Sequence, residues 1–302
     1  AISNSEQSGR LIATADSALG EVSSLLDDIR GLVSESANSG VLSDAQIAAN
    51  QLQVDSSLEA IDRISKSTTF QGKSLLNGSL GFITSGLTNS SSISELRVDQ
   101  ATLGTSGTLA VDVDITTAAA QASLTVGTGA FALSDSLVIQ VSGADGAEVF
   151  TFTSGSTITQ AVNAINLVSD ATGVTATNAS GVLTLTSSDY GSDAFVDIEV
   201  ISEGSSGAFN TNLSANRSTG TDIAATVNGV QASGDGNTLS VNTSTLDLEV
   251  TVANGSSTDF SFNVTGGGAV FQLGPEVVSS QQSRIGIEAV NTGKLGGTSG
   301  RL

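Results

Sequence analysis

Three aspartates around the only tyrosine are the residues whose types come nearest to an active site. Asp189, Asp193 and Asp197 follow one another at intervals of four residues, beside Tyr190. Paired carboxylates can serve as acid and base in glycosidic-bond cleavage. A cleft for that reaction also needs aromatic platforms, and aromatic residues make up only 4% of the sequence. We therefore interpret the three carboxylates as solvated loop and strand residues.

A second candidate is a turn with oxygen ligands for calcium. Ser233-Gly-Asp-Gly-Asn237 places Asp and Asn oxygens at a glycine bend, the type of ligand that Ca²⁺ prefers. The segment occurs once, without the repetition that is typical of calcium-binding β-rolls. We predict a plain hairpin turn here, and no metal or cofactor.

Composition excludes most catalytic chemistry. The chain has no Cys and no His, so it lacks thiolate nucleophiles, disulfides and the usual general base. The formal charge of −20 argues against nucleic acid or an anionic membrane as a partner. No apolar run is long enough to span a bilayer, and no signal peptide opens the chain. We predict that the protein is not an enzyme.

Acidic excess is concentrated in the middle of the chain. Between residues 89 and 270 the only basic residues are Arg97 and Arg217. A soluble, self-repelling surface is the simplest interpretation. The exterior of a filament that resists bundling is the more specific one.

The predicted elements of the chain begin with a helical region. Apolar side chains at alternating spacings of four and three form a heptad seam, which is typical of a helix lying along another helix. The segment Ser34–Gly40 ends the first helix, and a capping box of Ser43 and Gln46 starts the second, whose seam has one polar break at Gln51. The predicted packing seam consists of Leu11, Ala15, Ala18, Val22, Leu25, Ile29, Leu32, Ile47, Val54, Leu58 and Ile61.

Residues 61–78 form a corner where this helical region ends. Gly72 and Asn77-Gly78 permit the reversals that follow. The pattern I-D-R-x-x-x-x-T-x-F-x-G-x-x-L-L resembles the end of the N-terminal helical region of bacterial flagellin, and the resemblance extends over residues 8–78. Its residues here are Ile61, Asp62, Arg63, Thr68, Phe70, Gly72, Leu75 and Leu76.

The period changes from helical to alternating after residue 79. Turn signals such as Asp145-Gly146 and Asn228-Gly229 separate the strands. One helix, starting at a capping box of Thr157 and Gln160, interrupts them. Residues 148–201 resemble a short repeat of flagellin and hook-associated variable domains. The predicted strands are Thr108–Thr116, Ala122–Val126, Asp135–Val141, Glu148–Thr153, Gly181–Thr186, Phe195–Ile201, Ile223–Val227, Thr238–Val241, Leu246–Val252 and Thr258–Val264.

The last segment predicts a returning β-hairpin. Ala269–Leu273 and Ser283–Glu288 read as two strands, with the only proline, Pro275, between them. We thus expect an α+β protein: an antiparallel α-helical hairpin in 1–78, a β-rich variable outer region in 79–268 with two subdomains, and a β-hairpin in 269–302 that returns to the helical domain. No heptad follows residue 296, so we expect a flagellin truncated at both ends, and a monomer.

The resemblance implies a structural subunit of an extracellular bacterial flagellar filament that self-assembles with other flagellin subunits. It also implies an export chaperone and a filament cap as partners. Recognition by the innate immune receptor of flagellins is not implied, because Asp28 and Gln53 stand where recognised flagellins have Arg and Glu, although Leu32 matches. The alternatives are a hook–filament junction protein, a surface adhesin or glycan-binding module, and an enzyme inserted in a flagellin.

Overall fold

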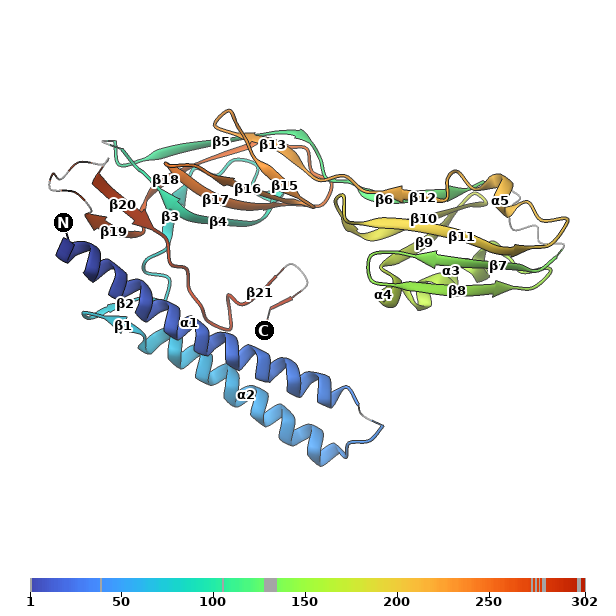
Figure 1. Ribbon diagram of the computed structural model, residues 1–302, viewed down its shortest axis with the longest axis horizontal. Helices are drawn as coiled ribbons and strands as arrows, with labels where there is room; N and C mark the ends of the chain where they lie inside the picture. Colours follow the sequence, from blue (N-terminus) through green and yellow to red (C-terminus); the bar gives the residue numbers. More distant parts are fainter. Residues whose placement is uncertain are drawn as a thin grey trace.

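The computed structural model describes residues 2–38, 40–104, 106–127, 135–272, 274, 276, 278, 281–297 and 300–301. The molecule is elongated: a pair of helices lies beside one β unit, and a second β unit extends from the first, away from the helices (Figure 1). The helices are α1 (Ile2–Ser36) and α2 (Asp44–Ser67), which lie side by side in opposite directions. The α+β class with an antiparallel helical hairpin is confirmed.

Helix α2 begins at the predicted capping box. The Ser43 hydroxyl accepts a hydrogen bond from the Gln46 amide at 3.4 Å, and the Gln46 side chain accepts one from the Ser43 amide at 2.9 Å. These two bonds satisfy amides that have no partner within the helix. The helix ends at Thr68, whose extended backbone directs the chain into the corner.

The corner after α2 is a tight hairpin of β1 (Thr69–Phe70) and β2 (Lys73–Ser74). Gln71 and Gly72 between these strands have φ values of 50° and 79°, the left-handed pair that a two-residue hairpin turn requires. Leu75 and Leu76, which follow β2, are completely buried.

The inner β unit consists of two sheets that enclose a hydrophobic core. One sheet has the order β14-β13-β5-β18-β3 and the other β15-β16-β17-β4-β20-β19, with all pairs antiparallel. Alternating side chains of both sheets, such as Val111, Leu248 and Phe262, fill the space between them. Its strands are β3 (Phe82–Ser85), β4 (Ile93–Ala101), β5 (Leu109–Thr117), β13 (Ala224–Val227), β14 (Val230–Gln231), β15 (Ser233–Asp235), β16 (Thr238–Asn242), β17 (Leu246–Val252), β18 (Phe260–Gly267), β19 (Ala269–Gln272) and β20 (Gln282–Ile285), with a 3-10 turn η1 at Ser90–Ser92.

The outer β unit is built from the chain between β5 and β13. It has a three-stranded sheet, β6-β10-β9, and a four-stranded sheet, β12-β11-β7-β8, around a second core that includes Phe209, Ile165 and Leu183. Its elements are β6 (Gln121–Val126), β7 (Leu137–Ser142), β8 (Ala147–Phe152), α3 (Ile158–Leu167), α4 (Ser169–Thr172), β9 (Val174–Ala179), β10 (Val182–Tyr190), β11 (Phe195–Glu203), α5 (Phe209–Asn212) and β12 (Arg217–Thr219).

Helix α3 covers the edge strand β9. It begins at the predicted capping box of Thr157 and Gln160, which the structure confirms. The Asn166 side chain donates to the Ala176 carbonyl at 2.9 Å and accepts from the Ala176 amide at 2.7 Å. One amide side chain thereby pairs with both backbone groups of a residue that has no neighbouring strand on that side.

Most predicted strands lie within three residues of the observed boundaries, but β4, one of the two nine-residue strands of the inner unit, was not predicted. Strand β4 has register shifts against β17 between Asp247 and Leu248 and between Thr251 and Val252. Each shift adds a residue that breaks the alternation. The prediction of a strand over Ser283–Glu288 was too long, because β20 ends at Ile285 and the Gly286 amide instead donates to the Asp99 carbonyl at 2.8 Å.

Short strands and edge strands were also missing from the prediction, among them β1, β2, β3, β9, β12, β14 and β15. The inner and outer cores both lie within residues 79–268, the span for which two subdomains are predicted; the domain boundaries stay a prediction. Ser39, Leu273 and Pro275, which belong to predicted features, lie outside the described residues.

The segment after β20 returns to the helices. Ile287 pairs with Leu80, and the Val290 amide donates to the Leu76 carbonyl at 2.9 Å. The Asp62 carboxylate then accepts the Thr292 amide at 2.9 Å and the Thr292 hydroxyl at 3.2 Å. The short strands β21 (Gly296–Gly297) and β22 (Gly300–Arg301) follow.

Replacing Leu76 with Ala is expected to destabilise the helical end by about 2–5 kcal/mol, because it leaves a cavity in a fully buried site. Urea unfolding followed by the helical circular-dichroism signal measures the loss. The matched control is Leu52→Ala on α2, where the side chain is 71% exposed, with an expected change within about 0.5 kcal/mol. Equal effects of the two substitutions would show that the corner is not a packing centre.

Replacing Asp62 with Ala is expected to release the return segment from α2. Because the lost bonds join a charged acceptor to an amide and a hydroxyl, the Thr292 amide is expected to exchange hydrogen roughly tenfold faster or more. Hydrogen exchange followed by NMR measures this. Glu59→Ala removes a solvent-exposed carboxylate one turn earlier on α2 and should leave the rate unchanged. An unchanged rate in the Asp62 variant would rule out this attachment.

Candidate functional site

The predicted seam of the helical region separates into buried and half-buried positions. Ala15, Val22, Ile29 and Ile61 are at most 5% exposed. The half-buried seam residues that pack against these are Leu11, Ala18, Leu25, Val54 and Leu58. Leu32 and Ile47 are half-buried near the loop between the helices and lie outside both apolar clusters. The structure therefore brings together most of the seam within a single chain.

Two small clusters hold this helical end together. The first joins Ala15 of α1 to Leu75 and Leu76 of the corner, with Phe70 and Ile64 packed around them. The second joins Val22 and Ile29 to Ile61 across the hairpin. Sequence reasoning missed Leu26 and Ile64 of the helices, Leu80 on the chain that leaves the corner, and Ile287, Val290 and Leu295 of the return segment, which complete the two clusters.

Polar contacts fix the corner where the chain leaves α2. The buried Ser65 hydroxyl donates to the Leu76 carbonyl at 2.7 Å, and the Leu75 amide donates to the Thr68 carbonyl at 3.0 Å. Asp62 holds Thr292, as described above. Arg63, the third residue of the I-D-R pattern, is exposed. In the I-D-R pattern, Ile61 is thus buried in the interior, Asp62 binds the return segment, and Arg63 lies on the surface.

A second apolar stripe runs along α1 beside the seam. Ile12, Leu19, Leu26 and Val33 follow at intervals of seven, each one residue after a seam position. Ile12, Leu19 and Val33 are 45%, 40% and 57% exposed. We call these four residues the α1 stripe. The repeat of seven could have revealed it in the sequence, and its exposure shows that α2 alone does not cover the apolar face of α1.

Of the residues considered for chemistry, Asp189, Tyr190 and Asp193 line one pocket, and Asp197 is not among the residues that line it. Asp197 faces Arg217 at 3.6 Å, and Ser233–Asn237 spans β15 and its hairpin turn into β16, which confirms the expected turn. Among the described residues, no group of His, Cys, Asp or Glu is arranged to hold a metal ion. No helix in the described ranges is long and apolar enough to cross a membrane.

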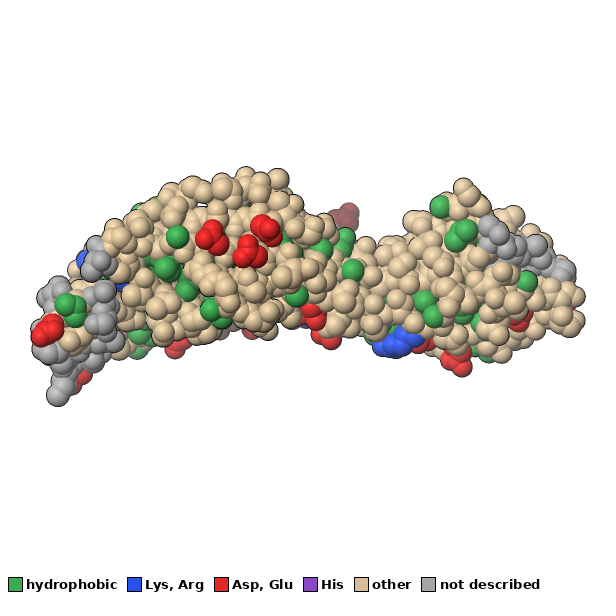
Figure 2. All heavy atoms as spheres, turned by 90° about the horizontal axis from the view of Figure 1, so that it is seen from above, with side chains coloured by type: hydrophobic (Ala, Val, Ile, Leu, Met, Phe, Trp, Pro, Cys, Tyr) green, Lys and Arg blue, Asp and Glu red, His purple; other side chains and the backbone are tan. Residues whose placement is uncertain are grey.

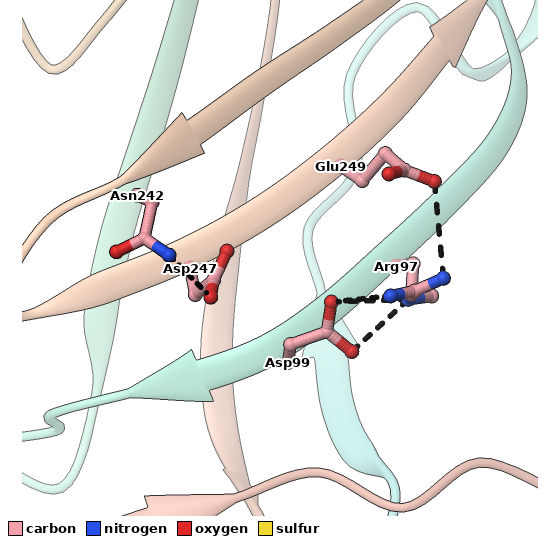
Figure 3. A network of polar contacts seen from close by, with 5 residues as sticks. All are labelled: Arg97, Asp99, Asn242, Asp247 and Glu249. Atoms are coloured by element: carbon pink, nitrogen blue, oxygen red, sulfur yellow. Dashed lines mark hydrogen bonds and ion pairs between the residues drawn. The ribbon is translucent and has the colours of Figure 1, made fainter.

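Acidic side chains outnumber basic ones on the β-unit face in Figure 2, where apolar side chains are scattered singly. Arg97, on strand β4 of the inner unit, pairs with nearby carboxylates (Figure 3). Arg97 donates to both oxygens of Asp99, the shortest contact being 2.8 Å, and lies 3.9 Å from Glu249 on β17. The hydrogen bonds with Asp99 are the main cause of the raised pKa of Arg97.

Arg217 has the same role in the outer unit. It pairs with Asp197 and stacks 3.9 Å from the centre of the Phe195 ring. The two arginines therefore pair with adjacent carboxylates.

Comparisons with known proteins find matches to the helical end and to part of the outer β unit. Residues 1–80 match the family model of the bacterial flagellin N-terminal helical region, and residues 138–189 match that of the flagellin hook IN motif. The B-type flagellin of Pseudomonas aeruginosa PAO1 is 45% identical over 71 residues, which are 24% of this chain and 14% of that protein. The match thus spans a small part of this relative.

Solved structures of flagellar cap proteins align with part of the chain. The D2-D3 domains of FliD from Serratia marcescens align with a TM-score of 0.37 and 18% identity over 55% of this chain and 95% of that one. FliD (HAP2) from P. aeruginosa PAO1 aligns with a TM-score of 0.40 and 16% identity over 58% and 85%. TM-scores this low do not establish a shared fold. From the family matches, residues 1–80 are similar to the N-terminal helical region of bacterial flagellins, and the β-rich region that follows contains a segment similar to the flagellin hook IN motif.

Proposed function

We propose that this chain is a structural subunit of a bacterial flagellar filament and acts by packing against further copies of itself. The observation that carries the proposal is the match of residues 1–80 to the flagellin N-terminal helical region. It coincides with the helical hairpin and with the corner at Leu75 and Leu76. The chemistry required is burial of apolar surface, and no catalytic group takes part.

The α1 stripe is the surface proposed to take part in assembly. Within the hairpin, Ala15, Val22 and Ile29 are already buried, whereas Ile12, Leu19 and Val33 are exposed. Burying a large aliphatic side chain contributes roughly 1.5–3 kcal/mol. The stripe therefore offers a continuous apolar row to a further helix, either of a neighbouring subunit or of the same protein.

The β units are proposed to face outward from the filament. Figure 1 places the outer β unit at the end of the molecule away from α1 and α2. Their acidic surface, in which Arg97 and Arg217 are already paired, would keep neighbouring filaments apart by repulsion.

The remaining partners follow from the proposed family role. An export chaperone and a filament cap are expected during secretion and growth, and the location is extracellular, on the bacterial flagellum. The side chains of Asp28 and Gln53 are exposed. Their types still argue against recognition by the innate immune receptor.

Acidic substitutions in the α1 stripe are expected to abolish filaments. The double variant Ile12→Glu/Leu19→Glu, made in the full-length natural form of the protein, places two charges where the proposal requires apolar contact. The control, Ser17→Glu/Ser24→Glu, adds the same charge on the side of α1 turned away from the stripe. Light scattering and negative-stain microscopy, with seeds of filament ends, measure assembly.

Filaments from the control and none from the stripe variant, with equal helical content in both, would support the proposal. Filaments from both variants would remove the stripe from the assembly surface. A well-folded, unsubstituted protein that stays monomeric with seeds would contradict the filament role and favour a hook–filament junction protein or an adhesin.

A further inference from the structure

The junction between the two β units is crossed twice by the chain. The outer unit is inserted after β5 and before β13, so residues 118–120 lead outward and residues 220–223 lead back. Ala120 and Thr221 pair in antiparallel fashion across the two crossings, with backbone hydrogen bonds of 2.9 and 3.0 Å. Figure 1 shows these crossings as the narrow connection between the units.

One carboxylate joins the two units at this point. Asp222 accepts hydrogen bonds from the Ser192 amide at 2.9 Å and from the Ser192 hydroxyl at 2.6 Å. Its Oδ1 also accepts the Gly236 amide at 2.9 Å. Ser192 precedes β11 of the outer unit, and Gly236 forms the turn between β15 and β16 of the inner unit. Asp222 thus connects loops that belong to different hydrophobic cores.

Closely packed backbone lies beside this half-buried carboxylate. A Cβ atom on Gly191, which has φ 107°, would lie 2.7 Å from Asp222 Oδ1 and 2.7 Å from the Gly236 Cα. A Cβ atom on Gly220 would lie 2.4 Å from the carbonyl oxygens of Ala120 and Gly191. Tyr190, at the end of the outer strand β10, packs against the core of the inner unit. The contacts reach across the junction from both sides.

We propose that Asp222 is a latch that fixes the outer β unit at one angle to the inner unit, so that the two move as one arm. Domains joined by short linkers and small contacts move relative to each other by default. A carboxylate that accepts three hydrogen bonds from two units opposes this motion, because charge-assisted bonds are stronger and more directional than neutral ones. The proposal concerns the mechanics of the chain and holds whether or not the chain forms filaments.

Distance measurements between the units test the latch directly. The chain has no Cys, so the substitutions Ser240→Cys on β16 and Thr177→Cys on β9 create two unique sites for spin labels on exposed strand positions. Double electron–electron resonance then gives the distribution of distances between the units. We expect a narrow distribution in the otherwise unchanged protein, and one broadened by roughly twofold or more in Asp222→Ala.

Two further variants separate the latch from general loss of stability. Ser192→Ala removes one of the three bonds and should broaden the distribution less. Asp259→Ala removes a carboxylate that accepts the Ile115 amide at 2.7 Å, but both residues lie within the inner unit. This control should keep the narrow distribution. Circular dichroism establishes that each variant is folded.

A broad distribution in the unsubstituted protein would overturn the proposal, since the junction would then be flexible. A narrow distribution in a folded Asp222→Ala variant would overturn it as well, since backbone pairing and packing would suffice. If Asp222→Ala does not fold, the comparison of Ser192→Ala with Asp259→Ala decides, and equal widths would contradict the latch.

Acid provides a second test. The hydrogen bonds from the Ser192 hydroxyl and amide and from the Gly236 amide hold the pKa of Asp222 below its ordinary value of 3.8. A carboxylate with a lowered pKa contributes its full stabilisation above the ordinary value, and loses it as the pH falls through the lower, folded-state value. The distance distribution should therefore stay narrow at neutral pH and broaden below 3.8.

Asp189 and Asp193 beside Ser192, and Asp235 beside Gly236, are the other acidic groups on the segments packed against Asp222. These three carboxylates remain in the Asp222→Asn variant. Any broadening of the distance distribution that this variant shows on acidification is therefore due to them and not to Asp222. Broadening confined to the protein with Asp222 supports the latch, and parallel broadening in both proteins contradicts it.

Discussion

The rest of the structure depends on burial of the apolar corner that follows α2. Leu75 and Leu76 are completely buried against Ala15 of α1, and the return segment contributes Ile287 and Val290 to the same cluster. Burial on this scale explains why a tight turn with left-handed backbone at Gln71 and Gly72 is maintained. The corner fixes where the β-rich chain leaves the helices and where it comes back.

The helical end, the inner β unit and the outer β unit are linked in series, and the chain crosses each junction twice. The helical end has small clusters, whereas each β unit has a continuous core of its own. Polar contacts tie these parts together at their junctions. Asp62 binds the return segment to α2, and Asp222 joins the β units. Such an arrangement gives an elongated molecule in which the outer β unit lies at the end away from the helices.

Local signals in the sequence were sufficient for α1, α2, α3 and most strands, whereas the four-residue helices α4 and α5 were not predicted. Heptad spacing and the capping boxes at Ser43 and Thr157 predicted the helices, because these features act within a few residues. Strand β4 escaped prediction because its bulges disturb the alternation. The contacts of Asp62 with Thr292 and of Asp222 with Ser192 span 230 and 30 residues. They arise from how the folded parts meet, which no local pattern encodes. The hairpin turn at Ser233–Asn237 was predictable from its glycine bend.

The central claim is that the helical end lies inside an assembly and the β units lie outside it. Electron cryomicroscopy of filaments formed by the full-length natural form of the protein tests this most directly. The account predicts that Ile12, Leu19 and Val33 are covered by a neighbouring helix and that the outer β unit projects from the surface. A reconstruction in which α1 is exposed to solvent, or in which the β units line the interior, would contradict it.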